Sequence, residues 1–342
     1  MNNMRVYILI LNWNGWRDTI ECLESVFRND YPNYKVIVCD NNSSDDSVKK
    51  ITNWAEGKIY VDLPDCNTLK YFSTPPVSKP IKFVYYEKEE AEKGGSIEDK
   101  DSKLILIQTG DNLGFAGGNN VGVRYALLKN NFAYIWMLNN DTVIRPDALT
   151  KMVDRMSEND QGGMCGSTVL YYNFPNTIQA LGGARFNSWL ATTKHIGENQ
   201  TRNKYVIDCE KIEKILDYIF GASMLISKEF ITKIGLLNED YFLYFEEIDW
   251  ALRSKNKFNL YYAHESIVYH KGGKSTNSHS LVKTKSNITD YYLIKNRIKI
   301  TKRYYKAKLF TVYFGVLLAM FNRIKRREWS KVVMIIKEII CK

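Results

Sequence analysis

Three carboxylates lie close together in a stretch of the sequence that is otherwise aromatic and apolar. They are Glu246, Glu247 and Asp249, within residues 242–250. Burial beside a like charge raises the pKa of a carboxyl and lets it accept a proton near neutral pH, so one of the three is a candidate general base. The alternative is the first turn of an amphipathic helix, where the helix dipole favours acids. That explains one or two acids better than three.

The turn Asn139, Asn140 and Asp141 is a candidate metal site. It follows the apolar residues 135–138 and precedes Pro146. A carboxylate at the end of a strand can hold a hard divalent cation that keeps open positions for the oxygens of a diphosphate. Taken alone, the turn is explained at least as well by an Asx-turn that caps the next helix.

His270 closes a strand-like run at 266–269 and is followed by a lysine- and glycine-containing run at 271–275. A neutral imidazole binds Mn²⁺ and similar ions, and lysines nearby attract phosphate. A lone histidine is more often structural, so metal binding depends on what lies beside it in the fold.

A glycine-rich stretch at 112–120 leads into a predicted helix. Glycines allow close backbone approach, and the first N–H groups of the helix can meet a phosphate or a ribose, although such turns often reflect only tight packing. No G-x-G-x-x-G follows a predicted strand, and residues 272–275 lack the upstream glycine of a P-loop. A dinucleotide-dependent oxidoreductase and a P-loop kinase are therefore disfavoured.

These candidates need a scaffold, and the first half of the chain alternates short apolar runs with helical patterns, as in βαβ units with a mostly parallel sheet. Strands are predicted at 6–12, 35–40, 104–109 and 134–138, and helices at about 18–28, 45–54 and 119–129. Polar residues end each strand, namely Asn12, Asp40 to Asn42, Asp111 with Asn112, and Asn139 to Asp141. Ligands of such sheets bind at the carboxyl ends of the strands, so these side chains are expected to converge on one crevice.

Residues of about 55–103 break this rhythm with several prolines and a charged run, and we interpret them as a partly flexible insertion. Further on, the pattern predicts helices at about 146–157 and 228–234 and strands near 166–172. With 342 residues, of which 45% are hydrophobic and 25% charged, the chain can bury a sizeable α/β core.

The six cysteines are scattered, without a C-x-x-C pair. This disfavours a zinc ribbon or a disulfide framework and favours reduced thiols in the cytosol. The first apolar run, at 6–11, is too short for a signal peptide. A cytoplasmic protein is therefore expected.

The positive charge of the chain belongs to its C-terminal part. Residues 281–342 hold 16 Lys and Arg against 3 Asp and Glu, whereas the whole chain has a net charge of +10. An apolar run at 309–321 is flanked by basic residues and is short for a spanning helix, which needs about 20 residues. It suits an amphipathic helix at an anionic membrane surface, and the alternative is a core helix with a solvated basic face.

In this order the motifs resemble those of family 2 glycosyltransferases, in particular the rhamnosyltransferase-like branch of polysaccharide assembly. The matching stretches are 10–15, 38–47, 114–120, 138–142, 221–224, 241–253 and 270–275. The resemblance implies a GT-A fold over residues 1–275, with a Rossmann-like nucleotide-sugar half to about residue 142 and an acceptor half from about residue 143. The basic tail, 281–342, lies outside it.

The resemblance also implies roles for single residues. The residues that it implies contact the nucleotide sugar are Asn12, Asp40, Asn42, Asp111, Asn112, Gly114, Phe115, Gly117, Asn119 and Asn140. It implies that Asp141 and His270 bind a divalent metal, Mg²⁺ or Mn²⁺. Asn139 is a weaker ligand, at the position where the D-x-D motif of the family has an aspartate. Glu247 resembles the general base of an inverting displacement, Asp249 is the next candidate, and Glu246 lies beside them.

The expected donor is a nucleotide-diphosphate sugar, such as dTDP-rhamnose or a UDP-sugar, and the expected acceptor is a lipid-linked or polysaccharide hydroxyl. One rival is a sugar-nucleotide nucleotidylyltransferase, which would need a basic glycine-rich loop where this chain has 12–15. Another is a non-catalytic sugar-nucleotide or nucleic-acid binding module. An inactive relative should have lost acids at 244–249, yet all three remain. The apolar run in the tail favours a membrane surface over nucleic acid.

Overall fold

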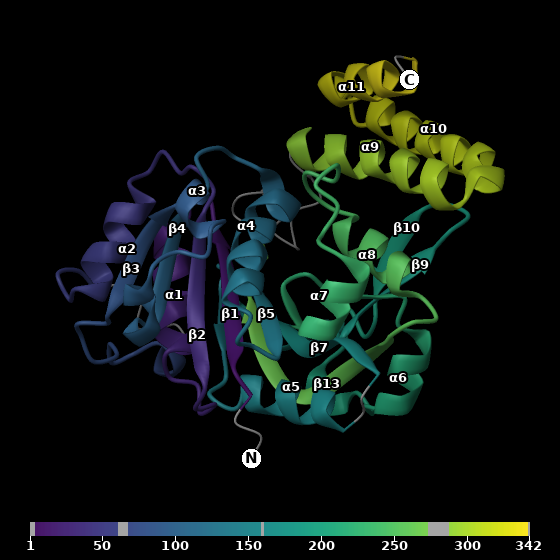
Figure 1. The fold of residues 1–342 in the computed structure, drawn as a ribbon. Coiled ribbons are helices and arrows are strands. Elements are labelled where there is room, and N and C mark those ends of the chain that lie inside the picture. Colours follow the sequence, from purple (N-terminus) through teal and green to yellow (C-terminus); the bar gives the residue numbers. More distant parts are fainter. Residues whose placement is uncertain (1–3, 61–67, 159–160, 273–286, 341–342) are drawn as a thin grey trace.

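The computed structural model describes residues 4–60, 68–158, 161–272 and 287–340, and its centre is a mixed sheet (Figure 1). The strands follow the order β3 (Phe83–Glu87), β4 (Leu104–Gln108), β2 (Tyr34–Asp40), β1 (Val6–Asn12), β5 (Tyr134–Asn139), β12 (Ser223–Ser227), β7 (Gly162–Tyr171), β13 (Asn259–His270) and β6 (Thr142–Ile144), while β8 (Phe174–Leu181) pairs with β7. From β3 to β5 the strands are parallel. β12 runs antiparallel to both β5 and β7.

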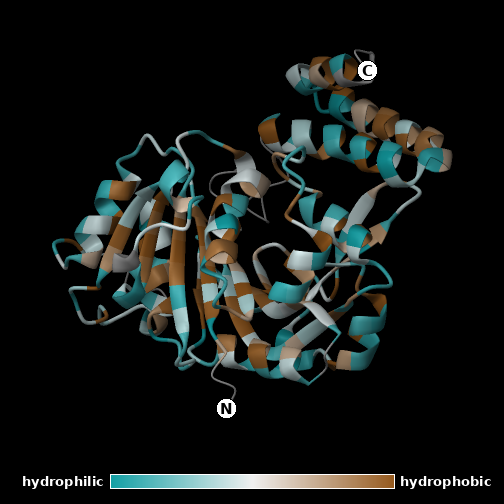
Figure 2. Cartoon of the chain, in the orientation of Figure 1, coloured by the Kyte–Doolittle hydropathy of each residue, from teal (hydrophilic) through white to brown (hydrophobic). Residues whose placement is uncertain are grey.

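Helices cover both faces of this sheet. One face carries α1 (Trp16–Val26), α2 (Ser47–Ala55) and α5 (Ala148–Ser157), and the other carries α4 (Gly114–Lys129), α7 (Lys228–Ile234) and α8 (Glu246–Ser254). In β1, Val6, Ile8 and Ile10 enter the first core and Tyr7 and Leu9 the second, because successive side chains of a strand point to opposite faces. Both faces are buried, so the strands are apolar throughout, as the brown centre of Figure 2 shows.

A smaller sheet and two short helices complete the main body of the chain. The small sheet has the order β10 (Thr192–His195), β9 (Gly183–Asn187) and β11 (Tyr218–Ile219). The short helices are α3 (Lys88–Ala91) and α6 (Cys209–Ile215). The four cysteines that the structure describes are unpaired.

Three helices form the tail, at the end of the molecule opposite to the N-terminus (Figure 1). They are α9 (Asn287–Tyr304), α10 (Leu309–Lys325) and α11 (Trp329–Ile340). They share a small core of their own, made of Ile294, Ile298, Val316 and Ile335. The side-chain amide of Asn296 joins α9 to the main body, since its Nδ2 donates to the carbonyls of Leu243 at 2.8 Å and Tyr244 at 2.9 Å.

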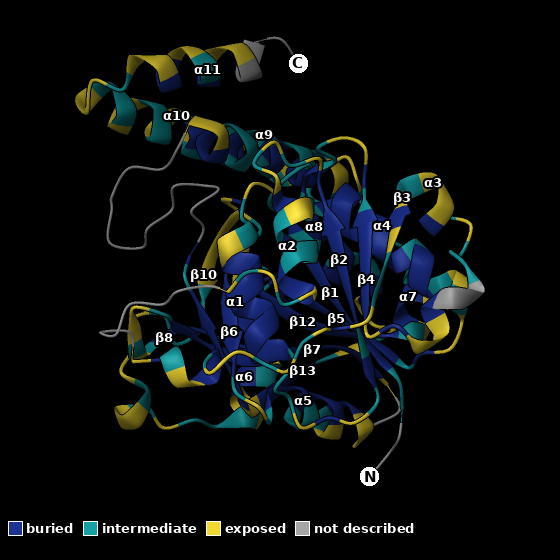
Figure 3. Ribbon diagram, turned by 90° about the vertical axis from the view of Figure 1, so that its left-hand side faces the viewer, coloured by how far each residue is buried: buried dark blue, intermediate teal, exposed yellow. Residues whose placement is uncertain are grey.

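Most residues of the helix α10 are exposed or intermediate and few are buried, as Figure 3 shows. Only Val312 and Val316 of this helix are buried, which does not fit a core helix. Its exposed apolar residues are Phe310, Phe314, Leu317, Leu318 and Phe321, whose spacing places them on one helical face. Among the described residues, the segment Lys306–Lys325 is long and apolar enough to cross a membrane by length and composition. The apolar run at 309–321 is thus part of a longer helical segment.

The predicted mostly parallel sheet with flanking helices is confirmed. The four predicted strands coincide with β1, β2, β4 and β5 to within two residues. Two features differ from the sequence interpretation. Residues 83–87, inside the interpreted insertion, form the edge strand β3 next to β4. The helix predicted at 119–129 begins at Gly114, so most of the glycine-rich stretch is helical.

Candidate functional site

The carboxyl ends of β1, β2 and β4 meet in a network around the carboxylate of Asp40. Its Oδ2 accepts from Asn12 Nδ2 at 2.6 Å and Ser43 Oγ at 2.7 Å, and its Oδ1 accepts from the Ser43 backbone N–H at 2.9 Å and Gln108 Nε2 at 3.1 Å. These donors arrive together because Asn12, Asp40 and Gln108 are in register across the sheet. A carboxylate has about four lone-pair sites, so Asp40 is fully engaged. A nucleobase would bind it by displacing a donor, and Gln108 makes the longest of these bonds.

The loop after β4 is held beside Asp40 by the side chain of Asn41. Its Nδ2 donates to Asn112 Oδ1 at 2.9 Å and to the Gly114 carbonyl at 3.1 Å, while its Oδ1 accepts from the backbone N–H of Leu113 at 3.1 Å. Asn41 is buried, whereas Asn42 and Asp111 on the two facing loops are exposed. Of the predicted contacts on these loops, the two exposed side chains are the ones open to a ligand.

The start of α4 is already engaged with the protein. Gly114 N–H donates to Asn112 Oδ1 at 3.1 Å, and Phe115 N–H donates to the Phe242 carbonyl at 2.7 Å. A Cβ at Gly114 would lie 2.2 Å from that same carbonyl oxygen, which explains the glycine. These two N–H groups are therefore not available to a phosphate in this conformation.

Two further predicted contacts lie inside α4. Asn119 is buried, and its Nδ2 donates to the Phe115 carbonyl at 2.9 Å. Gly117 is also buried, and a Cβ there would lie 2.7 Å from the Leu113 side chain. Both residues serve helix packing in this structure.

The turn after β5 brings Asp141 and His270 together. Asp141 Oδ1 lies 3.1 Å from His270 Nε2, and Asn139 Nδ2 lies 3.4 Å from the same nitrogen. His270 lies beside this turn because β13 pairs with β6, and His270 is opposite Thr142 in that pairing. Asn140 turns the other way, and its Nδ2 donates to Thr19 Oγ1 at 3.0 Å.

The Asp141 and His270 pair has the donor set and spacing for a divalent cation. His270 Nδ1 lies 2.9 Å from Gln179 Oε1, an acceptor that favours the tautomer with the proton on Nδ1, in which the lone pair of Nε2 faces Asp141. Two acceptor atoms then face each other. Adjacent ligands of an octahedral ion with bonds of about 2.1 Å are separated by about 3.0 Å, close to the observed distance. Among the described residues, no group of three or more His, Cys, Asp and Glu converges, so the protein would supply only part of the coordination shell.

Lys271, next to this pair, binds carboxylates of α1. Its Nζ lies 2.6 Å from Asp18 Oδ1 and also contacts Glu21 Oε2. These charges raise its pKa although burial opposes them. The idea that this lysine attracts phosphate is therefore not favoured, and Lys274 lies outside the described residues.

The two glutamates at the start of α8 differ from Asp249 in their surroundings. Burial raises the pKa of Glu247 to about 7, and the backbone N–H of Gly221 is among the donors that oppose this rise. Burial and the charge of Glu247 raise the pKa of Glu246 well above its usual range. Within the described parts of the chain, Glu246 Oε2 is buried without a hydrogen-bond partner. A carboxyl that titrates near neutral pH is suited to general base catalysis.

Asp249 points toward the tail and is fully buried. Its Oδ2 lies 2.8 Å from Arg253 Nε, and its Oδ1 accepts from Tyr304 Oη at 2.8 Å and lies 3.6 Å from Arg303 Nη1. The carboxylate therefore joins α8 to α9, a structural task that competes with a role as general base.

A three-residue segment, 220–222, links the parts of the site. The Phe220 ring lies 5.8 Å from the His270 ring, centroid to centroid. Gly221 lies against Glu247, since a Cβ there would fall 2.2 Å from Glu247 Oε1. The carbonyl of Ala222 accepts from Asn139 N–H at 3.0 Å. The base candidate and the metal candidates therefore share one wall.

Three residues of the site were not predicted. Gln108 ends an apolar strand, the same signal that identified Asn12. Thr19, which donates to Asn12 Oδ1 at 2.7 Å, lies one helical turn into α1 and gave no such signal. Gln179 reaches His270 only because β8 pairs with β7, which the local sequence does not reveal.

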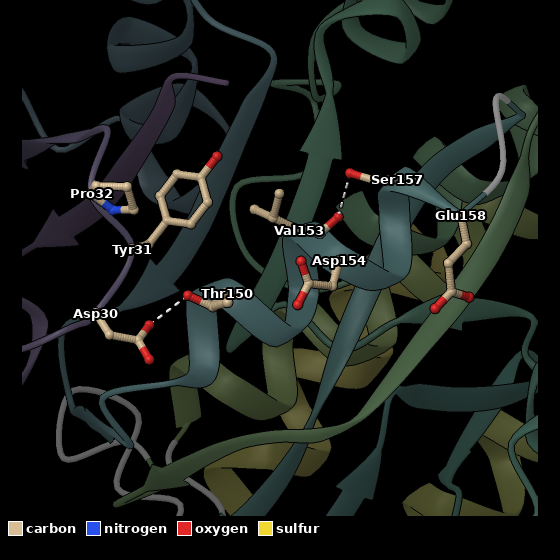
Figure 4. Close-up of a pocket in the computed structure, with 8 residues that line it drawn as sticks. All are labelled: Asp30, Tyr31, Pro32, Thr150, Val153, Asp154, Ser157 and Glu158. Carbon is tan, nitrogen blue, oxygen red and sulfur yellow. Dashed lines mark hydrogen bonds between the residues drawn. The ribbon is translucent and has the colours of Figure 1, made fainter. Parts of the chain in front are cut away.

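Figure 4 shows a pocket away from this edge, where Asp30 hydrogen-bonds to Thr150 of α5. It lies where the chain enters β2, at the amino ends of the parallel strands. None of its lining residues belongs to the site described above.

Comparison with known proteins identifies proteins to which the chain is similar. The sequence model described as Glycosyl transferase family 2 matches residues 7–67 and 88–228. Low-salt glycan biosynthesis hexosyltransferase Agl10 of Haloferax volcanii is 26% identical over 155 residues, which are 45% of this chain and 47% of that protein. The dTDP-rhamnosyl transferase RfbF of Shigella flexneri is 24% identical over 219 residues, 61% of this chain and 67% of that protein. The match to Agl10 thus spans about half of that relative.

Among solved structures, mannosyltransferase PcManGT from Pyrobaculum calidifontis, in complex with GDP-Man and Mn²⁺, is similar with a TM-score of 0.55. The match covers 99% of this chain and 88% of that one at 12% identity. Likeness at this identity concerns the fold, and it confirms the predicted GT-A fold.

Proposed function

Because the chain belongs to glycosyl transferase family 2, we propose that it transfers a sugar from a nucleotide diphosphate to an acceptor hydroxyl, with inversion at the anomeric carbon. The observation that carries this proposal is the segment 220–222, which packs against Glu247, against His270 and against the backbone of Asn139. A base and a diphosphate-binding cation on one wall are the two groups that such a displacement needs.

The donor nucleotide is proposed to bind at the carboxyl ends of β1, β2 and β4. Asp40 and Asn12 would contact the base, with the Gln108 amide displaced, and the exposed side chains of Asn42 and Asp111 would border the ribose. The relative from Shigella flexneri is named for dTDP-rhamnose, which makes dTDP- and UDP-sugars the first donors to test.

The diphosphate is proposed to lie beside Asp141. A divalent cation held by Asp141 and His270 would stabilise the negative charge of the leaving nucleoside diphosphate. Asn139 would be a weaker third ligand once its amide turns so that Oδ1, and not Nδ2, faces the ion. Gln179 Oε1 would accept the Nδ1 proton of His270 and so leave Nε2 as the atom that binds the cation. The mannosyltransferase of the same fold was solved with Mn²⁺, so Mn²⁺ is the first cation to test, followed by Mg²⁺.

Glu247 is proposed to be the general base. Its carboxylate takes the proton of the acceptor hydroxyl while the hydroxyl oxygen forms a bond to the anomeric carbon. The bond from that carbon to the diphosphate oxygen breaks on the opposite face, and the nucleoside diphosphate leaves with the electron pair. Gly221 holds the Glu247 side chain in place, and a Cβ at Gly221 would displace it. Asp249 is proposed to position α8 rather than to touch the substrate.

The acceptor is proposed to be lipid-linked, with the protein peripheral on the inner face of the cell membrane. The exposed apolar face of α10 is continued by Trp329, Val333 and Ile336 of α11, at helical spacing. Exposed basic residues flank it, which supports contact with an anionic surface. A spanning orientation is disfavoured because α10 packs against both α9 and α11, and α9 carries the charged residues Lys295, Arg297 and Lys299.

The proposal is tested by screening nucleotide sugars for thermal stabilisation of the protein and for slow hydrolysis, with Mn²⁺ and with EDTA. One nucleotide sugar, bearing uracil or thymine, is expected to raise the melting temperature in the presence of Mn²⁺ and to lose this effect in EDTA. Absence of stabilisation by any nucleotide sugar, under conditions in which the protein is folded, would refute the proposed donor class.

A further inference from the structure

A pocket rich in cationic side chains lies between the tail and the main body. It has a volume of about 340 Å³ and is walled by α9, α10, α11 and the start of β10. Four cations line it, namely Arg297, Arg323, Arg326 and Lys331, against the two acids Asp290 and Glu328. We call it the tail pocket. Its volume is that of about ten liquid waters, which leaves room for the nine heavy atoms of a diphosphate.

A buried carboxylate fixes two of these cations. Asp290 is 3% exposed, its oxygens accept from Arg323 Nη2 at 2.9 Å and Nε at 3.1 Å, and Lys331 Nζ lies 3.4 Å away. The two-point bond sets the plane of the Arg323 guanidinium and orients its remaining N–H groups. The pocket is therefore organised before any ligand arrives.

The remaining cations leave an excess of positive charge. Burial lowers the pKa of Arg297, and the nearby charge of Arg323 lowers it further. The Arg326 side chain is exposed and makes no ion pair among the described residues. A bound anion would relieve this repulsion, and arginine forks suit the oxygens of a phosphate.

The pocket lies between the exposed apolar face of the tail and the proposed base. On α10, Ala319 and Arg323 face the pocket, and helical periodicity places them opposite to Phe314 and Phe321 on the exposed face. On the other side the pocket is lined by Phe245, which directly precedes the glutamates of α8. From outside inward the order is an apolar surface, a cationic pocket and a general base.

This order matches the order of groups in a lipid-linked sugar, which is hydrocarbon, phosphate and sugar. We propose that the tail pocket binds the diphosphate of the membrane-anchored acceptor lipid and so presents the acceptor sugar to Glu247. The inference rests on the proposed function, because it takes the acceptor to be lipid-linked.

A second link joins the pocket to the base. Thr193 lines the tail pocket and hydrogen-bonds to the Tyr218 hydroxyl, and burial followed by the charge of Glu247 raises the pKa of that hydroxyl. The pocket wall thus adjoins the surroundings of Glu247 through β10 and β11 as well as through Phe245.

The test uses flotation of the full chain with three kinds of phosphatidylcholine vesicles: plain, with a polyprenyl diphosphate, and with phosphatidylglycerol at matched surface charge. The wild-type protein is expected to bind the diphosphate vesicles roughly tenfold more tightly than the phosphatidylglycerol vesicles, the effect of about one charge-assisted contact. Arg326→Glu is expected to remove this preference.

The matched control is Lys325→Glu, which makes the same change of charge one residue earlier. Lys325 is exposed and does not line the pocket. This variant should lower binding to both anionic vesicles equally and keep the preference between them. Arg297→Gln, with its melting temperature measured alongside, provides a second variant of the pocket and should also lose the preference.

Several results would overturn the proposal. They are equal binding of wild-type protein to the two anionic vesicles, a preference that survives Arg326→Glu, and an equal loss of preference in Lys325→Glu. Inorganic pyrophosphate that binds without vesicles as tightly as the lipid would mean that the site takes a free phosphate. Nucleotide-sugar stabilisation, measured on the same samples, tells whether the proposed function stands when the lipid preference fails.

Discussion

Glu247→Gln is expected to raise the free energy of unfolding at pH 8 while changing it little at pH 5. Burial raises the pKa of Glu247 from 4.5 to about 7, so the native state disfavours the ionised carboxylate. For a carboxyl with a raised native pKa, the stabilising contribution is fully present below pH 4.5 and is lost as pH rises to 7. This change of stability with pH is opposite in direction to that caused by a salt-bridged carboxylate.

The size of the effect follows from the two pKa values. At about 1.4 kcal/mol per pH unit, the ionised Glu247 costs the native state about 3 kcal/mol above pH 7. Glutamine has nearly the same shape, and its carbonyl oxygen can still accept from the Gly221 N–H. The neutral variant therefore removes the cost without losing the contact. It also removes the like charge beside Glu246, whose pKa is raised in part by Glu247.

The assay is denaturant-induced unfolding at pH 5 and pH 8. The control is Glu265→Gln, which neutralises an exposed acid paired with Lys151, and its effect should stay below about 1 kcal/mol at both pH values. A variant at Glu247 that loses stability at pH 8, or that changes it equally at both pH values, would refute the account of this carboxyl.

Three further predictions concern the other parts of the site. Asp141→Asn should weaken Mn²⁺-dependent donor binding about tenfold by calorimetry, because the charged ligand is lost. Donor binding that is insensitive to EDTA in the wild type would contradict this. Asp249→Asn should lower stability by about 3 kcal/mol, because Arg253 and Arg303 lose a buried partner, but should leave the pH profile of transfer unchanged. A shifted profile would assign it a catalytic role. Asp40→Asn should weaken binding of UDP or dTDP about tenfold, and unchanged dissociation constants for both would remove Asp40 from the base site.

The strand-end residues were predictable because a parallel sheet fixes where its polar ends meet. Apolar runs located β1, β2, β4 and β5, and the residue that closes β1 or β2 then has to lie at the carboxyl edge. Asn12 and Asp40 are found there, 2.6 Å apart. The pairing of β1 with β2, in which Asn12 is opposite Asp40, brings them into contact.

Features that depend on distant pairing were not predictable. Nothing near Gln179 in the sequence points to His270, and nothing near Asp249 points to Tyr304, 55 residues further on. The edge strand β3 was hidden because it is short and follows a proline-rich stretch. Contact of Gly117 and Asn119 with the donor stays a prediction, and the structure shows both residues buried in α4.

The central claim is that Glu247 takes the proton of the acceptor. It is tested most directly by comparing the transfer rates of Glu247→Gln and Asp249→Asn with their dissociation constants for the donor. Glu247→Gln is expected to lower kcat about a hundredfold or more, as for loss of a general base, while donor binding stays within about twofold. Transfer that survives Glu247→Gln but is abolished by Asp249→Asn, in a protein that is still folded, would contradict it.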